Sequence, residues 1–155
     1  MNKTIIAVVG GVVAVVAAGA LAFVVLDDED EASSGTPVTN ASELDGVWTV
    51  TNATSAPAPV VGTVRLTFEG GNLSAETGCN TATGPYSVED STLVADQLAS
   101  TRMACEEAFM TQEQWILEML SDTPRLELSG PQLALHWGAD ETYWLGLEQE
   151  DDLAP

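Results

Sequence analysis

The protein is a chain of 155 residues that carries 24 Asp and Glu residues against four Lys and Arg residues, a formal net charge of −20. The basic residues are scattered along the chain, at Lys3, Arg65, Arg102 and Arg125. Because nucleic-acid binding requires a concentrated basic surface, this composition argues against a nucleic-acid partner. The acidity is typical of a very soluble protein or of one adapted to high salt. The length leaves room for one domain of about a hundred residues.

An unbroken apolar run extends from Thr4 to Leu26. As a helix rising about 1.5 Å per residue it would reach roughly 35 Å, enough to cross a hydrocarbon core of about 30 Å. The run therefore predicts a transmembrane signal anchor over residues 1–26. A cleaved signal peptide, which would release a secreted protein, is the alternative, because small residues between Ala18 and Ala22 suit a peptidase.

Charges flank the predicted anchor asymmetrically. Lys3 precedes it, and an acidic run from Asp27 to Glu31 follows it. The basic end of an anchor prefers the cytoplasm, so we expect a single-pass protein of the cell membrane with its domain outside the cytoplasm. No cysteine precedes Cys79, which excludes a lipid-modified cysteine near the start of the chain.

Small residues recur every four positions within the anchor, at Gly10, Ala14, Ala18 and Ala22. Such a pattern lets two membrane helices approach closely, and it predicts weak self-association through the anchor. The simpler alternative is an anchor that is merely rich in alanine and glycine.

Residues 27–42 change to an acidic, Ser- and Pro-containing composition with little to bury, which predicts a linker. Beyond it, short stretches of alternating apolar residues are separated by turn residues, as in antiparallel strands. The expected strands are Val47–Thr51, Thr63–Glu69, Leu73–Thr77, Tyr86–Val88, Thr92–Ala95, Arg125–Leu128, Gln132–Trp137 and Thr142–Leu147. Residues 78–84 are expected to form a loop, and residues 150–155 an acidic tail.

The stretch from Ser100 to Leu120 predicts the one helix of the domain. At 100° per residue its apolar residues gather on one side, which indicates that this side is covered. These residues are Cys105, Ala108, Phe109, Trp115, Ile116, Met119 and Leu120. Thr111 followed by Gln114 also fits a capping box, which leaves open a shorter helix that begins at Thr111. Together the elements predict an α+β fold, a curled antiparallel sheet or partial barrel of about seven or eight strands with one inserted helix, preceded by a single transmembrane helix.

Several short motifs, spaced along the domain in a fixed order, resemble one family. They are Leu44, Gly46, Trp48, Phe68, Gly78, Cys79, Asn80, Gly84, Tyr86, Thr101, Met103, Ala104, Cys105, Glu113, Leu120, Leu133 and Leu135. The most specific parts are the Gly78–Asn80 tripeptide and the Thr101–Cys105 pentapeptide. In these residues the chain resembles the META domain, also called the HslJ-like domain, and we expect that domain to occupy residues 43–149.

Members of this family are small envelope or exported proteins, so the resemblance implies that this chain is one as well. Some members have been linked to heat shock, antibiotic tolerance, motility or virulence. The resemblance also implies a fold like that of the lipid-binding pilot proteins of secretion systems. The resemblance implies no enzymatic reaction, so we expect no catalytic residue, no metal and no cofactor. The expected function is a non-enzymatic binding or stress-related module of the cell envelope, whose partner is an envelope protein. The alternative is a carrier of a lipid or another hydrophobic molecule.

Cys79 and Cys105 are the only cysteines, and outside the cytoplasm an even pair most often forms a disulfide. Closing this loop would stabilise the fold by roughly 3 kcal/mol on the chain-entropy model. Two buried free thiols are the first alternative, and a reactive or metal-binding pair is the second. One histidine and two cysteines at unrelated spacings do not form a zinc ligand set.

Glu113 lies among apolar residues of the helix, where a carboxylate requires a partner. We expect it to bond backbone amides or Thr101, or to pair with Arg102, close to the Cys79 loop. His136, the only histidine, alternates with apolar strand residues and is expected to face solvent. The four tryptophans, Trp48, Trp115, Trp137 and Trp144, are either core residues or the lining of an apolar cavity.

Overall fold

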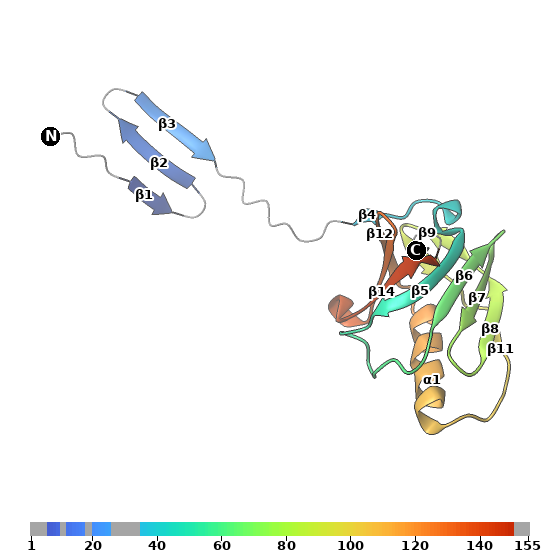
Figure 1. Cartoon of the computed structure of the whole chain (residues 1–155). Helices are drawn as coiled ribbons and strands as arrows, with labels where there is room; N and C mark the ends of the chain where they lie inside the picture. The colour runs from blue at the N-terminus through green and yellow to red at the C-terminus, as the bar shows by residue number, and fades with distance from the viewer. Residues whose placement is uncertain (1–5, 10–11, 18–19, 26–34, 151–155) are drawn as a thin grey trace. The chain divides into compact units, whose positions relative to one another are not determined.

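The computed structural model of the protein describes residues 6–9, 12–17, 20–25 and 35–150, with side chains from residue 35 onward. It separates an N-terminal unit from a domain that begins at Gly35. Figure 1 shows both units.

The N-terminal unit is a three-stranded antiparallel sheet in the order β1-β2-β3. Its strands are β1 (Ile6–Val9), β2 (Val12–Ala17) and β3 (Ala20–Val25). Among the described residues no helix is both long enough and apolar enough to cross a membrane. The expected transmembrane helix is therefore not seen, and the strands reflect the preference of β-branched valine and isoleucine for extended backbone. Gly10 and Ala18 of the small-residue pattern lie outside the described residues.

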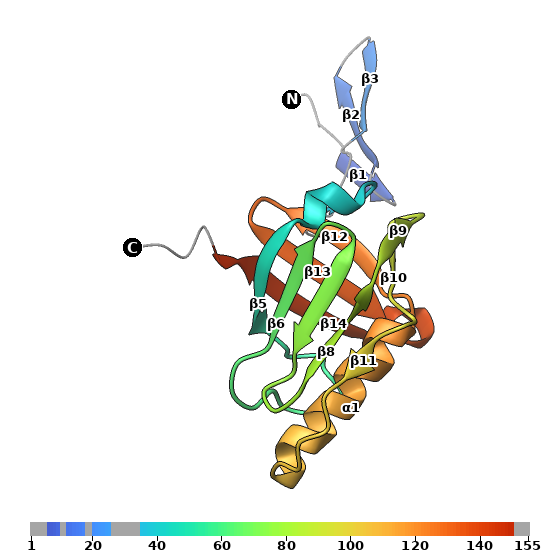
Figure 2. The same ribbon diagram turned by 90° about the vertical axis from the view of Figure 1, so that its right-hand side faces the viewer.

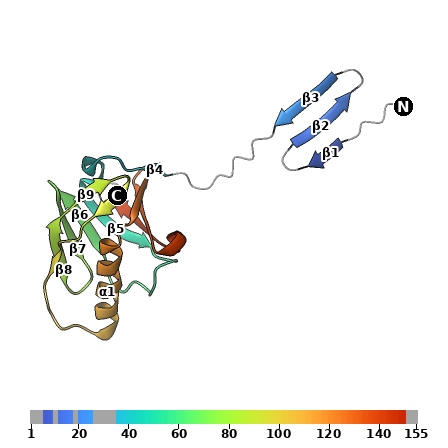
Figure 3. The same ribbon diagram turned by 180° about the vertical axis from the view of Figure 1, so that it is seen from behind.

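The domain is built on one eleven-stranded sheet in the order β11-β8-β7-β6-β5-β14-β13-β12-β10-β9, with β4 paired to β12. All of these neighbours are antiparallel. The strands are β4 (Thr36–Pro37), β5 (Gly46–Asn52), β6 (Arg65–Glu69), β7 (Asn72–Glu76), β8 (Thr81–Pro85), β9 (Ser87–Glu89), β10 (Thr92–Val94), β11 (Ala99–Ser100), β12 (Arg125–Ser129), β13 (Gln132–Trp137) and β14 (Tyr143–Gln149). The sheet curls, and α1 (Glu107–Ser121) lies between its two halves, as Figure 1 and the opposite view in Figure 3 both show.

The core lies between the inner face of the curled sheet and α1. Alternating residues of the strands enter it, such as Leu66 and Phe68 of β6 and Leu133 and Leu135 of β13, each at most 1% exposed. From α1 come Trp115, Ile116, Met119 and Leu120, all buried. Burying one such side chain stabilises the fold by about 1.5–3 kcal/mol, so the alternating and helical patterns of the sequence determine which residues form this core.

The curled α+β architecture is confirmed, but the expected number of strands is wrong. Three strands were missed: β4, β8 and β11. The two-residue strands β4 and β11 carry no periodic pattern of their own and exist because they pair with β12 and β8. Residues 81–85 had the composition of a loop, yet they pair along β7 as β8, whose Gly84 lets the backbone of Gln97 approach closely.

The start of the helix also differs from the expectation. Residues 100–106 are not helical, because Ser100 belongs to β11 and the backbone N–H of Thr101 donates to the carbonyl of Thr81 at 3.1 Å. Figure 2 shows this segment running beside β8 before α1 begins. The helix begins at Glu107, so the alternative start at Thr111 is wrong as well.

Part of the expected linker belongs to the domain. Val38 is fully buried in the core, and a 3-10 helix, η1 (Ala41–Leu44), follows it. The Glu43 carboxylate accepts hydrogen bonds from the backbone N–H groups of Thr39, at 2.9 Å, and Asn40, at 2.7 Å. These contacts close a capping box that holds the start of the domain in place.

Acid should weaken the domain through Glu43. Hydrogen bonds from the backbone of Thr39 and Asn40 lower its pKa below the ordinary value of 4.5. A carboxyl group whose pKa is lowered on folding stabilises the fold above its unfolded pKa, and this stabilisation is lost as the pH falls through the folded pKa. We therefore expect Glu43→Gln to reduce stability at pH 7 and to make the loss of stability below pH 4.5 less steep.

Urea unfolding between pH 7 and pH 3 measures both effects. Glu69→Gln, at an exposed hairpin position, is the matched control and should follow the unmodified protein. This account would be contradicted if the free energy of unfolding fell with pH in the same way for the Glu43 variant and for the unmodified protein.

Candidate functional site

The side chain of Asn80 is the centre of a buried polar network between the sheet and α1. Asn80 immediately precedes β8 and is 3% exposed. Its Nδ2 donates to Oε2 of Glu113 at 2.6 Å and to the carbonyl oxygen of Met103 at 3.3 Å. Its Oδ1 accepts from the hydroxyl of Thr101 at 2.9 Å and from the backbone N–H of Met103 at 2.8 Å. One amide thus satisfies groups from two segments that approach each other only in the folded chain.

Glu113 ties the network to α1. Its carboxylate is on the inner side of the helix, and the residue is 9% exposed. One oxygen accepts from Asn80 and the other accepts from the hydroxyl of Ser100 at 2.7 Å. The expectation that Glu113 is buried near the Cys79 loop is confirmed. The expected partners were wrong, because Asn80 and Ser100 bind the carboxylate, whereas Thr101 bonds Asn80.

Gln112, the neighbour of Glu113, forms a second clamp that the sequence analysis missed. The side chain is 1% exposed. Its Nε2 donates to the carbonyls of Thr77, at 2.7 Å, and Val61, at 3.0 Å, while its Oε1 accepts from the N–H of Val61 at 2.6 Å. The available signal was a glutamine one turn before Ile116, within the apolar side of the helix.

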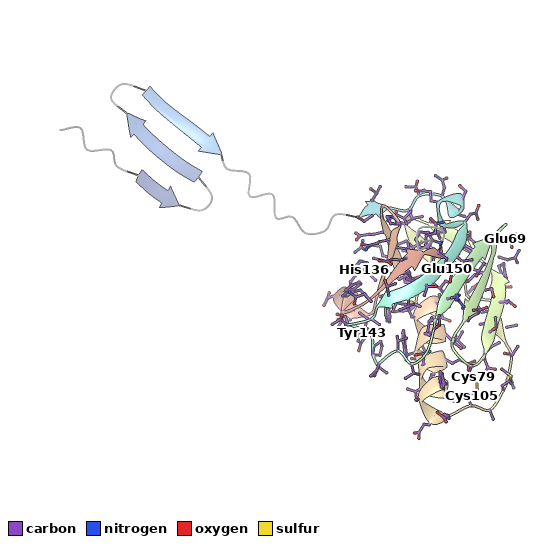
Figure 4. The ribbon with its side chains drawn as sticks, in the orientation of Figure 1. Glu69, Cys79, Cys105, His136, Tyr143 and Glu150 are labelled. Carbon is purple, nitrogen blue, oxygen red and sulfur yellow. A yellow bond between two sulfur atoms is a disulfide. The ribbon has the colours of Figure 1, made fainter. Side chains whose placement is uncertain are left out.

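A disulfide joins Cys79 and Cys105, so the expected pairing is confirmed and neither cysteine is free. The two Cα atoms are 6.3 Å apart, within the range that a disulfide spans. Figure 4 shows both cysteines near the N-terminal end of α1. The bond fixes the turn that carries Asn80 to the segment that leads into the helix.

The backbone at the first position of the Gly78–Asn80 tripeptide requires glycine. Its φ is +97°, in the region that favours glycine, and a Cβ there would lie 3.0 Å from both Gln112 Nε2 and Phe109 Cδ1. The tripeptide therefore combines a tight approach to α1, a covalent link and the central amide of the network.

A groove of about 600 Å³ lies beside this network. The residues 101–104 form one wall and α1 forms the other. Met103 is 57% exposed and Met110 is 43% exposed, and Leu117 also lines the groove. The charged residues that line the groove are Arg102, Glu107 and Glu113. The arrangement presents flexible apolar side chains on a rigid frame, which suits binding of another apolar group.

His136 lies in a different part of the domain, as Figure 4 shows. It alternates with buried strand residues as expected, but its side chain is only 21% exposed, and its Nε2 lies 3.5 Å from Oε2 of Glu127. Glu127 and Glu141 also bind Arg125. The hydrogen bonds that the guanidinium of Arg125 donates to these two carboxylates raise the pKa of Arg125. Hydrogen bonding to Arg125 lowers the pKa of Glu141.

The tryptophans do not share one cavity. Trp48 is 1% exposed, and its indole N–H donates to the carbonyl of Leu44 at 2.7 Å, so it is a core residue. Trp144 is partly exposed opposite His136 on β14. Trp115 and Trp137 stack with ring centroids 6.3 Å apart at the other end of α1.

A sequence model of the META domain matches residues 41–150. The chain belongs to the META domain family. The family motif residues are thereby placed: Gly78, Cys79 and Asn80 form the turn before β8, Thr101, Met103, Ala104 and Cys105 form the segment before α1, and Glu113 lies within α1. All of them meet at the polar network, the disulfide or the adjoining groove.

Two solved structures have the same fold as this META domain. An NMR structure of a protein from Burkholderia xenovorans is 23% identical, with a TM-score of 0.60, and the match covers 75% of this chain and 89% of that chain. A second NMR structure is 22% identical, with a TM-score of 0.57, and the match covers 76% of this chain and 100% of that chain. No curated protein matches the sequence significantly.

Removing the Glu113 carboxylate should destabilise the META domain. Glu113→Ala removes the acceptor of one N–H of Asn80, whose amide keeps only the carbonyl of Met103, and leaves the Ser100 hydroxyl only the carbonyl of Thr101. We expect a loss of about 2–3 kcal/mol. Glu113→Gln should cost only about 1 kcal/mol, because the new amide oxygen accepts from Asn80 and the Ser100 hydroxyl accepts from the new amide nitrogen.

Glu118→Ala is the control on the exposed side of the same helix and should change stability by less than about 0.5 kcal/mol. Urea or thermal unfolding of the four proteins gives the comparison. A structural role of Glu113 fails if both of its variants unfold like the unmodified protein.

Proposed function

We propose that this META domain protein is a non-enzymatic, membrane-anchored module of the cell envelope that binds a protein partner outside the cytoplasm. The groove between residues 101–104 and α1 is the recognition surface. The observation that carries this proposal is the exposure of two methionines side by side in the groove: Met103, on the segment that the Asn80 network and the disulfide hold, and Met110, on α1.

Methionine suits such a surface because its unbranched, polarisable side chain adapts to partners of different shape. Large apolar side chains exposed together usually mark an interaction site. The backbone of Met103 is fixed, since Asn80 binds both its N–H and its carbonyl. A partner therefore meets a preorganised backbone, which lowers the entropy cost of binding.

The proposed membrane anchor rests on the apolar run from Thr4 to Leu26 and on its flanking charges. A sheet with open edges cannot span a bilayer, because its unpaired N–H and C=O groups find no partner in hydrocarbon. Insertion of this run therefore requires conversion of β1–β3 into a helix, which satisfies its backbone groups internally. The small residues at four-residue spacing would then let two anchors associate weakly.

Cell fractionation tests the location. We expect the full chain to stay with membranes after an alkaline carbonate wash and to be cleaved by protease added to intact spheroplasts. Cys79 and Cys105 should resist alkylation until a reductant is added, because disulfides persist outside the cytoplasm. A variant without residues 4–26 should stay in the cytosol with both thiols free. Recovery of the full chain from the cytosol would refute the anchor, and release of a shortened protein into the medium would favour signal cleavage.

Proximity labelling from the full chain in living cells tests the groove. Met103→Ser combined with Met110→Ser should remove the specifically labelled envelope proteins while leaving the melting temperature nearly unchanged, because both side chains are exposed. Asp96→Ser, at an exposed residue outside the groove, is the control. An unchanged labelling pattern in the double variant would rule out the groove as the binding surface. A lipid that stays bound in native mass spectra would favour the carrier alternative.

A further inference from the structure

A second hollow, of about 490 Å³, lies at the C-terminal end of α1 and shares no lining residue with the methionine groove. Its walls include Pro57, three aromatic residues, Trp115, Trp137 and Tyr143, and two acidic residues, Glu118 and Asp122. This volume is within the range of small-molecule sites. The proposed function uses none of these residues.

The aromatic rings form a connected wall. Trp115 and Trp137 are parallel, with ring centroids 6.3 Å apart and an interplanar angle of 2°. Tyr143 continues the wall, with its ring centroid 5.6 Å from that of Trp137, and it is 36% exposed. A Cβ at Gly138 would lie 2.9 Å from the Tyr143 ring, so the backbone confines this ring. The faces of aromatic rings carry negative potential and attract cations.

The hollow is also strongly acidic. Glu118 and Asp122 lie at the end of α1, where the helix dipole adds partial negative charge. Helices commonly place Lys or Arg in their last turn, but α1, described along its whole length, has no basic residue there. None of the described side chains that line the hollow is basic. Arg125, which follows α1 in the chain, is already bound by Glu127 and Glu141.

Both carboxylates keep one oxygen available. Oε1 of Glu118 accepts from Gln114 Nε2 at 3.0 Å, and Oδ2 of Asp122 accepts from the N–H of Gly138 at 3.3 Å. Among the described residues, the other oxygen of each group has no hydrogen-bond partner. These bonds position the two negative charges without neutralising them.

We infer that this hollow binds a quaternary ammonium group, as found in choline and in phosphocholine headgroups. A trimethylammonium cation offers no N–H donor, has a low cost of desolvation and presents methyl groups to aromatic faces. A primary ammonium instead needs three acceptors and is strongly hydrated. The combination of aromatic wall, helix C-terminus and two carboxylates therefore fits a methylated cation best.

Tryptophan fluorescence of the full chain, in maltoside micelles at constant ionic strength, tests this site. Titration with choline should give a saturable change, because two of the four tryptophans line the hollow. The neutral isostere 3,3-dimethylbutan-1-ol should bind at least about tenfold more weakly, since only its charge differs. Equal binding of the isostere, or a change that does not saturate, overturns the proposal.

Variants identify the residues. Tyr143→Leu and the pair Glu118→Gln with Asp122→Asn should each weaken choline binding by about fivefold or more, with the melting temperature used to confirm folding. Asp96→Asn and the Met103→Ser, Met110→Ser pair, which lie outside the hollow, should bind choline normally. The assignment is refuted if these controls lose choline binding, or if Tyr143→Leu and the pair Glu118→Gln with Asp122→Asn both bind choline normally. The methionine pair also separates failure of this site from failure of the groove.

Phosphocholine and the basic amino acids distinguish the source of the ligand and its chemistry. Binding of choline tighter than phosphocholine supports a free small molecule, because the phosphate would face two carboxylates, whereas tighter binding of phosphocholine supports a lipid headgroup. Both results agree with a site for a quaternary ammonium group. Binding of arginine or lysine as tight as that of choline would show that the hollow takes cationic side chains, and would overturn the preference for a quaternary ammonium.

Discussion

The structure of this META domain depends on the hydrogen bonds of one buried amide. The side chain of Asn80 holds Met103 by both of its backbone groups and reaches Glu113 on α1. Without this amide, the N–H and the carbonyl of Met103 would lose this partner, and the Glu113 carboxylate would keep only Ser100. Each buried group left without a partner costs about 1–3 kcal/mol. The disulfide joins the turn that carries Asn80 to the segment before α1, and Gln112 ties α1 to Thr77, which precedes that turn.

This frame gives the two ends of α1 different chemistry. At the N-terminal end the segment before α1 exposes Met103, and α1 itself exposes Met110. At the C-terminal end Trp137 and Tyr143 meet carboxylates that no basic residue in the last turn compensates. An apolar partner suits the first end and a cation suits the second. Because the same helix forms a wall of both sites, a rigid α1 is a requirement that they share.

The excess of carboxylates over basic side chains explains why this domain can attract cations. Arg65 is paired with Glu76 and Glu150, and Arg125 is paired with Glu127 and Glu141. Among residues 35–150, these contacts use two of the three arginines, and most carboxylates there have no salt bridge to an arginine. The resulting negative potential repels anionic partners and favours neutral or cationic ones, over a distance of about 8–10 Å at physiological salt.

The sequence by itself determined the features whose signals are local or belong to the family: the alternation of Leu133 and Leu135, the apolar side of the helix, the family motifs and the disulfide. Tertiary structure decided the rest. The two-residue strands β4 and β11 form only because distant strands offer them hydrogen bonds. Gln112 binds Val61, 51 residues away, and Trp115 meets Trp137 from another element. Periodicity records which side of an element is buried, whereas the partner that covers a polar group there depends on how distant elements pack.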